Sequence, residues 1–114
     1  MSGSEGWLVA CLCAEWCGSC REYRALFEAA RAAHPAARFA WVDIEDHPDV
    51  LGTVEVENFP SLLIAHGDDI AFFGTVTPHA ATLDALVKRA TARELGSVDA
   101  PELDGVPARI RALQ

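Results

Sequence analysis

Near the N-terminus, a continuous apolar run gives way to a helical pattern. Residues Trp7–Cys13 are all apolar and lie between Gly6 and Glu15. This length, with its β-branched and aromatic side chains, is typical of a strand buried on both faces. From Cys17 onward, apolar side chains recur along one side of a helix, with arginine and glutamate on the other. His34-Pro35 ends this helix, because the residue before a proline disfavours helical geometry.

The rest of the chain alternates strands and helices. We predict strands over residues 38–44, 61–65 and 70–75, with a hairpin turn at residues 66–69. A short helix opens at Pro48, and a longer one begins with Thr77 as N-cap and Pro78 in the first helical position. The order β-α-β-α-β-β-α predicts an α/β fold, a three-layer sandwich with helices on both faces of a mixed, four-stranded central sheet.

The domain organisation follows from the same pattern. The chain has 114 residues, the size of one ordinary domain, and its 51% hydrophobic content is enough for a core. We assign residues 1–92 to one domain and residues 93–114, which contain two glycines and two prolines, to a C-terminal tail with one or two helical turns. No apolar run reaches the ~18–20 residues that a membrane span requires.

Charge is distributed unevenly. Seventeen acidic against nine basic residues give a net charge of −8, which disfavours a nucleic-acid binder, because such a protein needs a basic stripe. Eight of the acids fall in a stretch without lysine or arginine: Asp43, Glu45, Asp46, Asp49, Glu55, Glu57, Asp68 and Asp69. This stretch is either a solvated rim or an electrostatic filter on binding partners.

The four cysteines lie within ten residues, at positions 11, 13, 17 and 20. A disulfide scaffold spreads its cysteines along the chain, so this clustering indicates local thiol chemistry or a metal. Cys17 lies at the junction between a predicted strand and a predicted helix, and a helix N-terminus stabilises a thiolate. Cys20, one turn later, can resolve a mixed disulfide, and Gly18 permits close approach of a partner backbone. The alternative is a structural zinc site formed by all four thiolates.

Two segments resemble the thioredoxin superfamily over about residues 7–92. Ala14-Glu15-Trp16-Cys17-Gly18-Ser19-Cys20 is similar to the family's active-site segment, and Phe59-Pro60-Ser61-Leu62-Leu63-Ile64 to its proline loop. The resemblance implies that Cys17 attacks and Cys20 resolves. It further implies that Pro60 packs on the disulfide and prevents metal capture, that the Phe59 backbone pairs with an extended substrate, and that Trp16 contributes to the partner surface.

The chain also departs from the family pattern. Only about seven residues precede the motif strand, so we expect the usual N-terminal strand and helix to be missing and residues 93–114 to fold back over the exposed sheet edge. Cys11 takes the position of a buried acid and Trp41 that of its lysine, so the usual proton relay is missing. Cys11 is then either a small buried hydrophobe or an accessory thiol that exchanges with Cys20. Ser19 replaces the commoner proline between the cysteines, and Cys13 takes an often aromatic position that would loosen packing.

We therefore expect a thioredoxin-like thiol–disulfide oxidoreductase, of the protein-disulfide reductase type, acting in cell redox homeostasis through Cys17 and Cys20. Its partners would be disulfide-containing proteins and a separate electron-donor reductase, with no cofactor, metal or nucleic acid. We expect a cytoplasmic protein, or a periplasmic one if a leader has been removed. Eight arginines against one lysine hint at a bacterial, GC-rich genome. The alternatives are a redox-regulated binding module without turnover and a zinc-stabilised structural domain.

Overall fold

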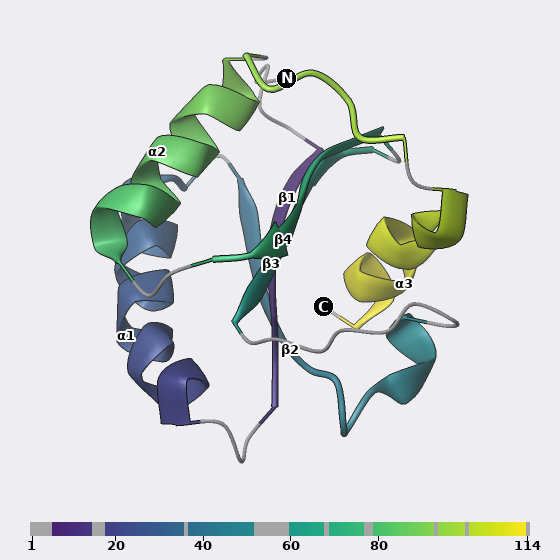
Figure 1. The fold of residues 1–114 in the computed structure, drawn as a ribbon, viewed down its shortest axis with the longest axis horizontal. Coiled ribbons are helices and arrows are strands. Elements are labelled where there is room, and N and C mark those ends of the chain that lie inside the picture. The colour runs from purple at the N-terminus through teal and green to yellow at the C-terminus, as the bar shows by residue number, and fades with distance from the viewer. Residues whose placement is uncertain are drawn as a thin grey trace.

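The fold is a three-layer α/β sandwich. The computed structural model describes residues 6–14, 18–35, 37–51, 60–67, 69–76, 79–92, 94–99 and 101–113, except for the side chain of residue 19. Its elements, in which η denotes a short 3-10 helix, run in the order β1 (Trp7–Cys13), α1 (Gly18–Ala33), β2 (Arg38–Asp43), η1 (Pro48–Val50), β3 (Ser61–His66), β4 (Asp69–Thr75), α2 (Ala80–Thr91), η2 (Pro101–Leu103) and α3 (Val106–Ala112) (Figure 1).

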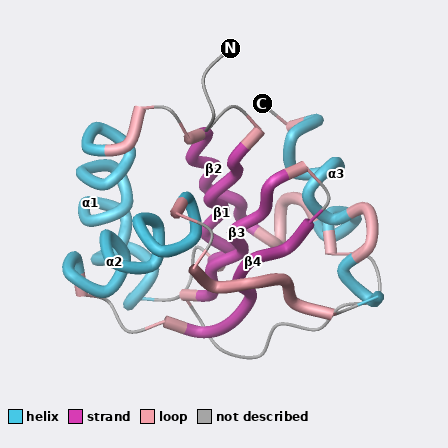
Figure 2. The backbone as a smooth tube through the Cα atoms, turned by 90° about the horizontal axis from the view of Figure 1, so that it is seen from above, coloured by secondary structure: helices cyan, strands magenta, loops and turns pink. Residues whose placement is uncertain are grey.

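The sheet is mixed and four-stranded, in the order β2-β1-β3-β4 (Figure 2). Strands β1 and β2 pair in parallel, whereas β3 is antiparallel to both β1 and β4. Helices α1 and α2 cover one face and α3 covers the other (Figure 1). The predicted fold class is confirmed.

Strand β1 is central and is buried on both faces, which explains its unbroken apolar sequence. The side chains of Trp7, Val9, Cys11 and Cys13 enter the core beneath α1 and α2. Those of Leu8, Ala10 and Leu12 enter the core beneath η1 and α3. Because successive side chains of a strand point to opposite faces, Cys11 and Cys13 lie on the same side as α1.

The C-terminal segment supplies much of the second core. Leu103, Val106 and Ile110 are at most 1% exposed and pack with β1 and β2 side chains such as Leu12 and Val42. Residues 101–113 therefore fold back onto the domain as expected, but α3 lies over a face of the sheet and not along its exposed edge (Figure 1). The physical reason is that its apolar stripe buries more surface against the face than a strand edge would offer.

The bounds of two helices differ from those predicted from the sequence. Among the described residues after β2, Pro48–Val50 form the 3-10 turn η1, and the predicted helix beyond Leu51, including Val54, lies outside the described residues. The prediction that α2 begins with Thr77 as its N-cap is wrong. The N-cap is His79, whose extended backbone (φ −121°, ψ 130°) delays helical geometry until Ala80. In the described part of the chain, no helix is both long and apolar enough to cross a membrane.

Candidate thiol site

The strand-to-helix junction carries the predicted motif. Strand β1 ends at Cys13, Ala14 is buried, and α1 begins at Gly18, the residue after Cys17 in the sequence. No acidic residue occupies the first turn of α1, so that turn itself contributes no carboxylate to offset the positive end of the helix. Arg21, in that turn, adds positive charge. Both features favour a thiolate at the helix N-terminus.

The predicted site residues divide into described and undescribed positions. Trp16, Cys17 and Phe59 lie outside the described residues, and nothing is said of the side chain at position 19. Gly18 is exposed at the start of α1, whereas Cys20 is 1% exposed and faces the core. The predicted pairing of Cys17 with Cys20 therefore stays a prediction.

Pro60 lies at the end of the sheet that carries the motif. The antiparallel register pairs Leu12 with Ser61, which places Pro60 at the same end of the sheet as Cys13. Pro60 is buried, and its carbonyl accepts a hydrogen bond of 3.0 Å from the backbone N–H of Val76. This bond ties the start of β3 to the end of β4 and so fixes the chain at the proline.

The structure joins Cys13 and Cys20 in a disulfide, a pairing that the sequence analysis missed. Their Cα atoms lie 5.8 Å apart, within the separation that a disulfide requires. Both side chains are 1% exposed. The signal that was available is that Cys13 ends the motif strand on the face that α1 covers. Cys13 therefore does not merely loosen the packing behind the motif.

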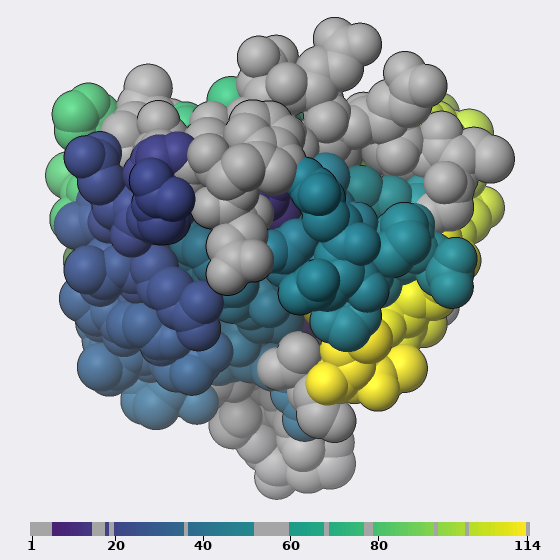
Figure 3. All heavy atoms as spheres, turned by 90° about the horizontal axis from the view of Figure 1, so that it is seen from below, coloured from purple at the N-terminus to yellow at the C-terminus, as the bar shows by residue number. Residues whose placement is uncertain are grey.

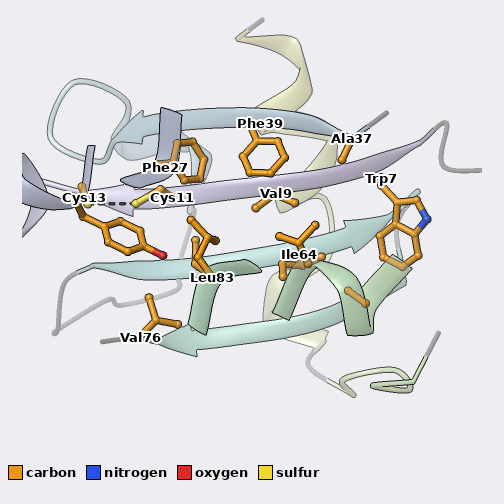
Figure 4. Packing of buried hydrophobic residues seen from close by; sticks show 14 of the residues in the cluster. Trp7, Val9, Cys11, Cys13, Phe27, Ala37, Phe39, Ile64, Val76 and Leu83 are labelled. Carbon is orange, nitrogen blue, oxygen red and sulfur yellow. Dashed lines mark hydrogen bonds between the residues drawn. The ribbon is translucent and has the colours of Figure 1, made fainter. Parts of the chain in front are cut away.

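Cys11 completes a cluster of three buried sulfurs. Its Sγ lies 3.3 Å from the Sγ of Cys13 (Figure 4), and the thiol is free and fully buried. Burial raises the pKa of the Cys11 thiol far above its ordinary value, so the group keeps its proton. Because Cys13 has no proton while it is bonded to Cys20, Cys11 is the donor in this contact.

Tyr23 lies one turn after Cys20 on the same helix and is also fully buried. Its hydroxyl has no hydrogen-bond partner among the described residues. Burial, followed by the proximity of Cys11, raises the pKa of the Tyr23 phenol above its ordinary value. Cys11, at the position where the family resemblance implies a buried acid, and the nearby Tyr23 phenol therefore both stay neutral.

A cavity of about 380 Å³ opens beside Cys20. It is lined by Ala14, Cys20, Arg21, Arg24, Trp41, Asp43, Asp46 and His47. The Arg24 guanidinium lies 5.1 Å from the centre of the Trp41 ring. The start of α1 and the segment after β2 flank the same face of the molecule (Figure 3). The cavity therefore combines cationic and anionic walls, and both of the acids in its lining, Asp43 and Asp46, belong to the acidic stretch seen in the sequence.

The turn after β2 is held in place by Asp43. Its Oδ1 accepts hydrogen bonds from the backbone N–H groups of Glu45, at 2.9 Å, and Asp46, at 3.4 Å. Such a side-chain turn fixes the wall of the cavity opposite α1. Among the described residues, no group of three or more histidine, cysteine or acidic side chains is arranged to hold a metal ion.

Known proteins are similar to this chain in sequence and in fold. The family model described as Thioredoxin matches residues 2–92. The curated protein "Putative thioredoxin 2" of Streptomyces coelicolor is 32% identical over 75 residues, which are 64% of this chain and 55% of that protein. The chain thus spans little more than half the length of this relative.

Solved thioredoxin structures share the fold. That of Fasciola hepatica superposes with a TM-score of 0.67 at 22% identity, over 75% of this chain and 83% of that one. That of Trypanosoma brucei brucei gives a TM-score of 0.68 at 22% identity, over 78% and 79% of the two chains. At this identity the likeness concerns the fold. Together with a cysteine pair at disulfide distance, the family match fits thiol–disulfide chemistry.

Proposed function

The chain belongs to the thioredoxin family, and on that basis we propose that it reduces or exchanges protein disulfides through Cys17 and Cys20. The observation that carries the proposal is the position of the motif. Helix α1 begins at the residue after Cys17, and Cys20 lies buried in its first turn. We assign the attacking role to Cys17, next to this helix end, and the resolving role to Cys20, which is 1% exposed.

The proposed reaction has two exchange steps. The Cys17 thiolate attacks one sulfur of a substrate disulfide, a mixed disulfide forms, and the other substrate sulfur leaves as a thiolate. The Cys20 thiolate then attacks the Cys17 sulfur, which releases the second substrate sulfur and forms the Cys17–Cys20 disulfide. The substrate gains two electrons and the cysteine pair loses two. A separate electron-donor reductase restores the dithiol.

The surroundings of the motif support the separation of these roles. The exposed N-terminus of α1 and Arg21 favour a thiolate at Cys17, whereas burial keeps Cys20 from attacking substrates directly. Pro60, at the same end of the sheet, would shape the groove, with Trp16 and the Phe59 backbone contacting an extended substrate segment. The charged cavity beside Cys20 would favour substrates with complementary charge. We place the protein in the cytoplasm, or in the periplasm if it is exported.

Dithiothreitol-driven reduction of insulin tests the proposal. The wild-type protein should accelerate precipitation of the insulin B chain, and Cys17→Ser should abolish the acceleration. A binding module without turnover would give no acceleration in either protein. Metal analysis of protein purified under reducing conditions checks the zinc alternative, which predicts about one bound zinc per chain. The reduction potential gives the direction: about −270 mV indicates a reductant and about −120 mV an oxidant.

A further inference from the structure

Cys20 has a potential partner in the core besides Cys17. Cys13 lies behind the first turn of α1, its Cα is 5.8 Å from that of Cys20, and both side chains are 1% exposed. Cys11 lies on the same face of β1, with its sulfur 3.3 Å from that of Cys13 (Figure 4). The thiol-bearing residues therefore extend inward from the motif, from Cys20 to Cys13 and then to Cys11.

We propose that Cys13 is a second redox partner of Cys20, and that the disulfide formed between Cys17 and Cys20 is passed inward to Cys13 and Cys20. The formation of the Cys17–Cys20 disulfide rests on the proposed function. The ability of Cys13 to bond to Cys20 is independent of that function, because it follows from the 5.8 Å separation of their Cα atoms.

The inward step is a balanced exchange. The Cys13 sulfur, as a thiolate, attacks the Cys20 sulfur; the Cys13–Cys20 bond forms and the Cys17–Cys20 bond breaks. Cys17 leaves as a thiolate and takes up the proton that Cys13 gave up. No electron enters or leaves the protein, so the step needs neither an oxidant nor a reductant.

Cys11 acts as a positioning residue in this exchange. A buried thiolate is costly unless a donor satisfies it, and the Cys11 S–H lies within hydrogen-bonding distance of the Cys13 sulfur. Since burial raises the pKa of Cys11, this donor keeps its proton at neutral pH. Cys11 remains the free thiol of the cluster.

The exchange changes what the oxidised protein presents to its partners. The inner disulfide joins two side chains that are each 1% exposed, so external thiols attack it far more slowly than an exposed disulfide. Cys17 is regenerated as a thiol. The reverse of the exchange, through Cys17, is then the favoured route for reduction of the inner disulfide. The oxidised couple is thereby stored in the core while the attacking thiol is restored.

Protease cleavage sites in the sequence allow a Cys13–Cys20 disulfide to be distinguished from a Cys17–Cys20 disulfide. Glutamyl endopeptidase cleaves after Glu5, Glu15 and Glu22, which separates Cys11 and Cys13 from Cys17 and Cys20. After oxidation with diamide, blocking of free thiols and digestion at pH 4, a Cys13–Cys20 disulfide keeps residues 6–15 and 16–22 joined. A Cys17–Cys20 disulfide leaves them apart. We expect the joined species in the wild-type protein. Exclusive recovery of separate peptides, with residues 16–22 oxidised, would overturn the proposal.

Variants that lack Cys17 test the pairing without turnover. We expect Cys17→Ala to fall from three free thiols to one on diamide oxidation, as a monomer. Cys11→Ala in that background should still fall from two to none, but more slowly, because the Cys13 thiolate has lost its donor, and Cys11→Ser should restore the rate. Cys13→Ala in that background should keep both. Cys11 and Cys13 are matched in burial and side chain, so each double variant controls for the other. Circular dichroism confirms that each variant is folded.

The outcomes separate this inference from the proposed function. Three retained thiols in the folded Cys17→Ala protein would refute the inner disulfide, even if the wild type reduces insulin. Loss of both thiols in the Cys13→Ala double variant would assign the partnership to Cys11 instead and would also refute it. Conversely, an inner disulfide in a protein that never reduces insulin would refute only the proposed function.

Discussion

The Nε of Arg109 in α3 donates a hydrogen bond of 2.8 Å to the backbone carbonyl of Val50, 59 residues earlier in the chain. Val50 ends η1 and is itself buried. This bond therefore ties the C-terminal helix to the segment that follows β2. His47, which precedes η1, lines the cavity beside Cys20, so the C-terminal helix supports one wall of the candidate site.

Loss of this bond should loosen η1. We expect Arg109→Met, which keeps an apolar stem, to lower the free energy of unfolding by about 1–3 kcal/mol, because a carbonyl loses a charged donor. Amide hydrogen exchange at Val50, whose N–H bonds to His47, should also accelerate. Arg111→Met is the control, since its bonds to Gly6 and Gly67 are exposed. Equal effects of the two variants on Val50 exchange would contradict the assignment.

The apolar face of α3 should matter more than its sequence position suggests. Ile110 is 0% exposed, so we expect Ile110→Ala to cost about 2–5 kcal/mol in urea unfolding. Leu113, which caps the same helix and is 40% exposed, provides the control, and Leu113→Ala should cost less than about 1 kcal/mol. A small effect of Ile110→Ala would mean that residues 101–113 do not form part of the core in solution.

The protein should lose stability in alkaline solution. Burial raises the pKa of Cys11 in the folded state, so the folded protein retains a proton that the unfolded chain releases above pH about 8.5. The contribution of the protonated Cys11 thiol to the free energy of unfolding is fully present below that pH. It falls by about 1.4 kcal/mol per pH unit above it. Urea titrations between about pH 7 and about pH 11 should show this loss in the wild type.

Two variants test which buried group causes the loss of stability at alkaline pH. Cys11→Ala should remove the part that begins near pH about 8.5. Tyr23→Phe should remove only the part that begins near pH about 10, because the Tyr23 phenol also has a raised pKa. If Cys11→Ala follows the wild-type curve throughout, Cys11 is not the buried group responsible.

Removing the Tyr23 hydroxyl should not weaken the protein at neutral pH. The hydroxyl is buried without a partner among the described residues, so the folded state bears its desolvation cost. We expect Tyr23→Phe to leave stability unchanged or to raise it by up to about 2 kcal/mol. Tyr23→Leu, which also removes the ring, should destabilise. A loss above about 1 kcal/mol in Tyr23→Phe would reveal a bonding partner for the hydroxyl.

The Asp84 carboxylate, which is hydrogen-bonded to His34 across the two helices of one layer, should make stability depend on pH. Nε2 of His34, which follows α1, lies 2.7 Å from Oδ1 of Asp84 in α2, and Nζ of Lys88 lies 3.0 Å from Oδ2. The hydrogen bonds from His34 and then Lys88 lower the pKa of Asp84. A lowered pKa stabilises the fold above the unfolded value of about 3.9, and this contribution is lost as pH falls through the folded value.

Asp84→Asn should therefore be less stable than the wild type at pH 6, and the difference should vanish in strongly acidic solution. Asp99→Asn is the control, because Asp99 is an exposed carboxylate. Urea midpoints between pH 2 and 6 measure both. A difference for Asp84→Asn that does not change with pH would show that packing, rather than the charge, is responsible.

Local patterns in the sequence determined most of the element order. The apolar run of β1, the helical stripe after Cys17 and the turn at Gly67 each act within a few residues, so periodicity predicts them. The start of α2 was misplaced because an N-cap signal and a proline do not specify the φ and ψ of the residue that follows them. The two motifs likewise sufficed to suggest the thioredoxin family.

Only the tertiary structure decided which cysteine sulfur bonds to Cys20 and where the C-terminal residues pack. The approach of Cys13 to Cys20 depends on how α1 packs across the end of β1, which no spacing rule encodes. Helix α3 has seven residues, too few to be stable alone, and it persists because Val106 and Ile110 are buried against the sheet. The sequence by itself therefore determined the elements and the candidate chemistry. Packing between distant segments determined the thiol cluster and the second core.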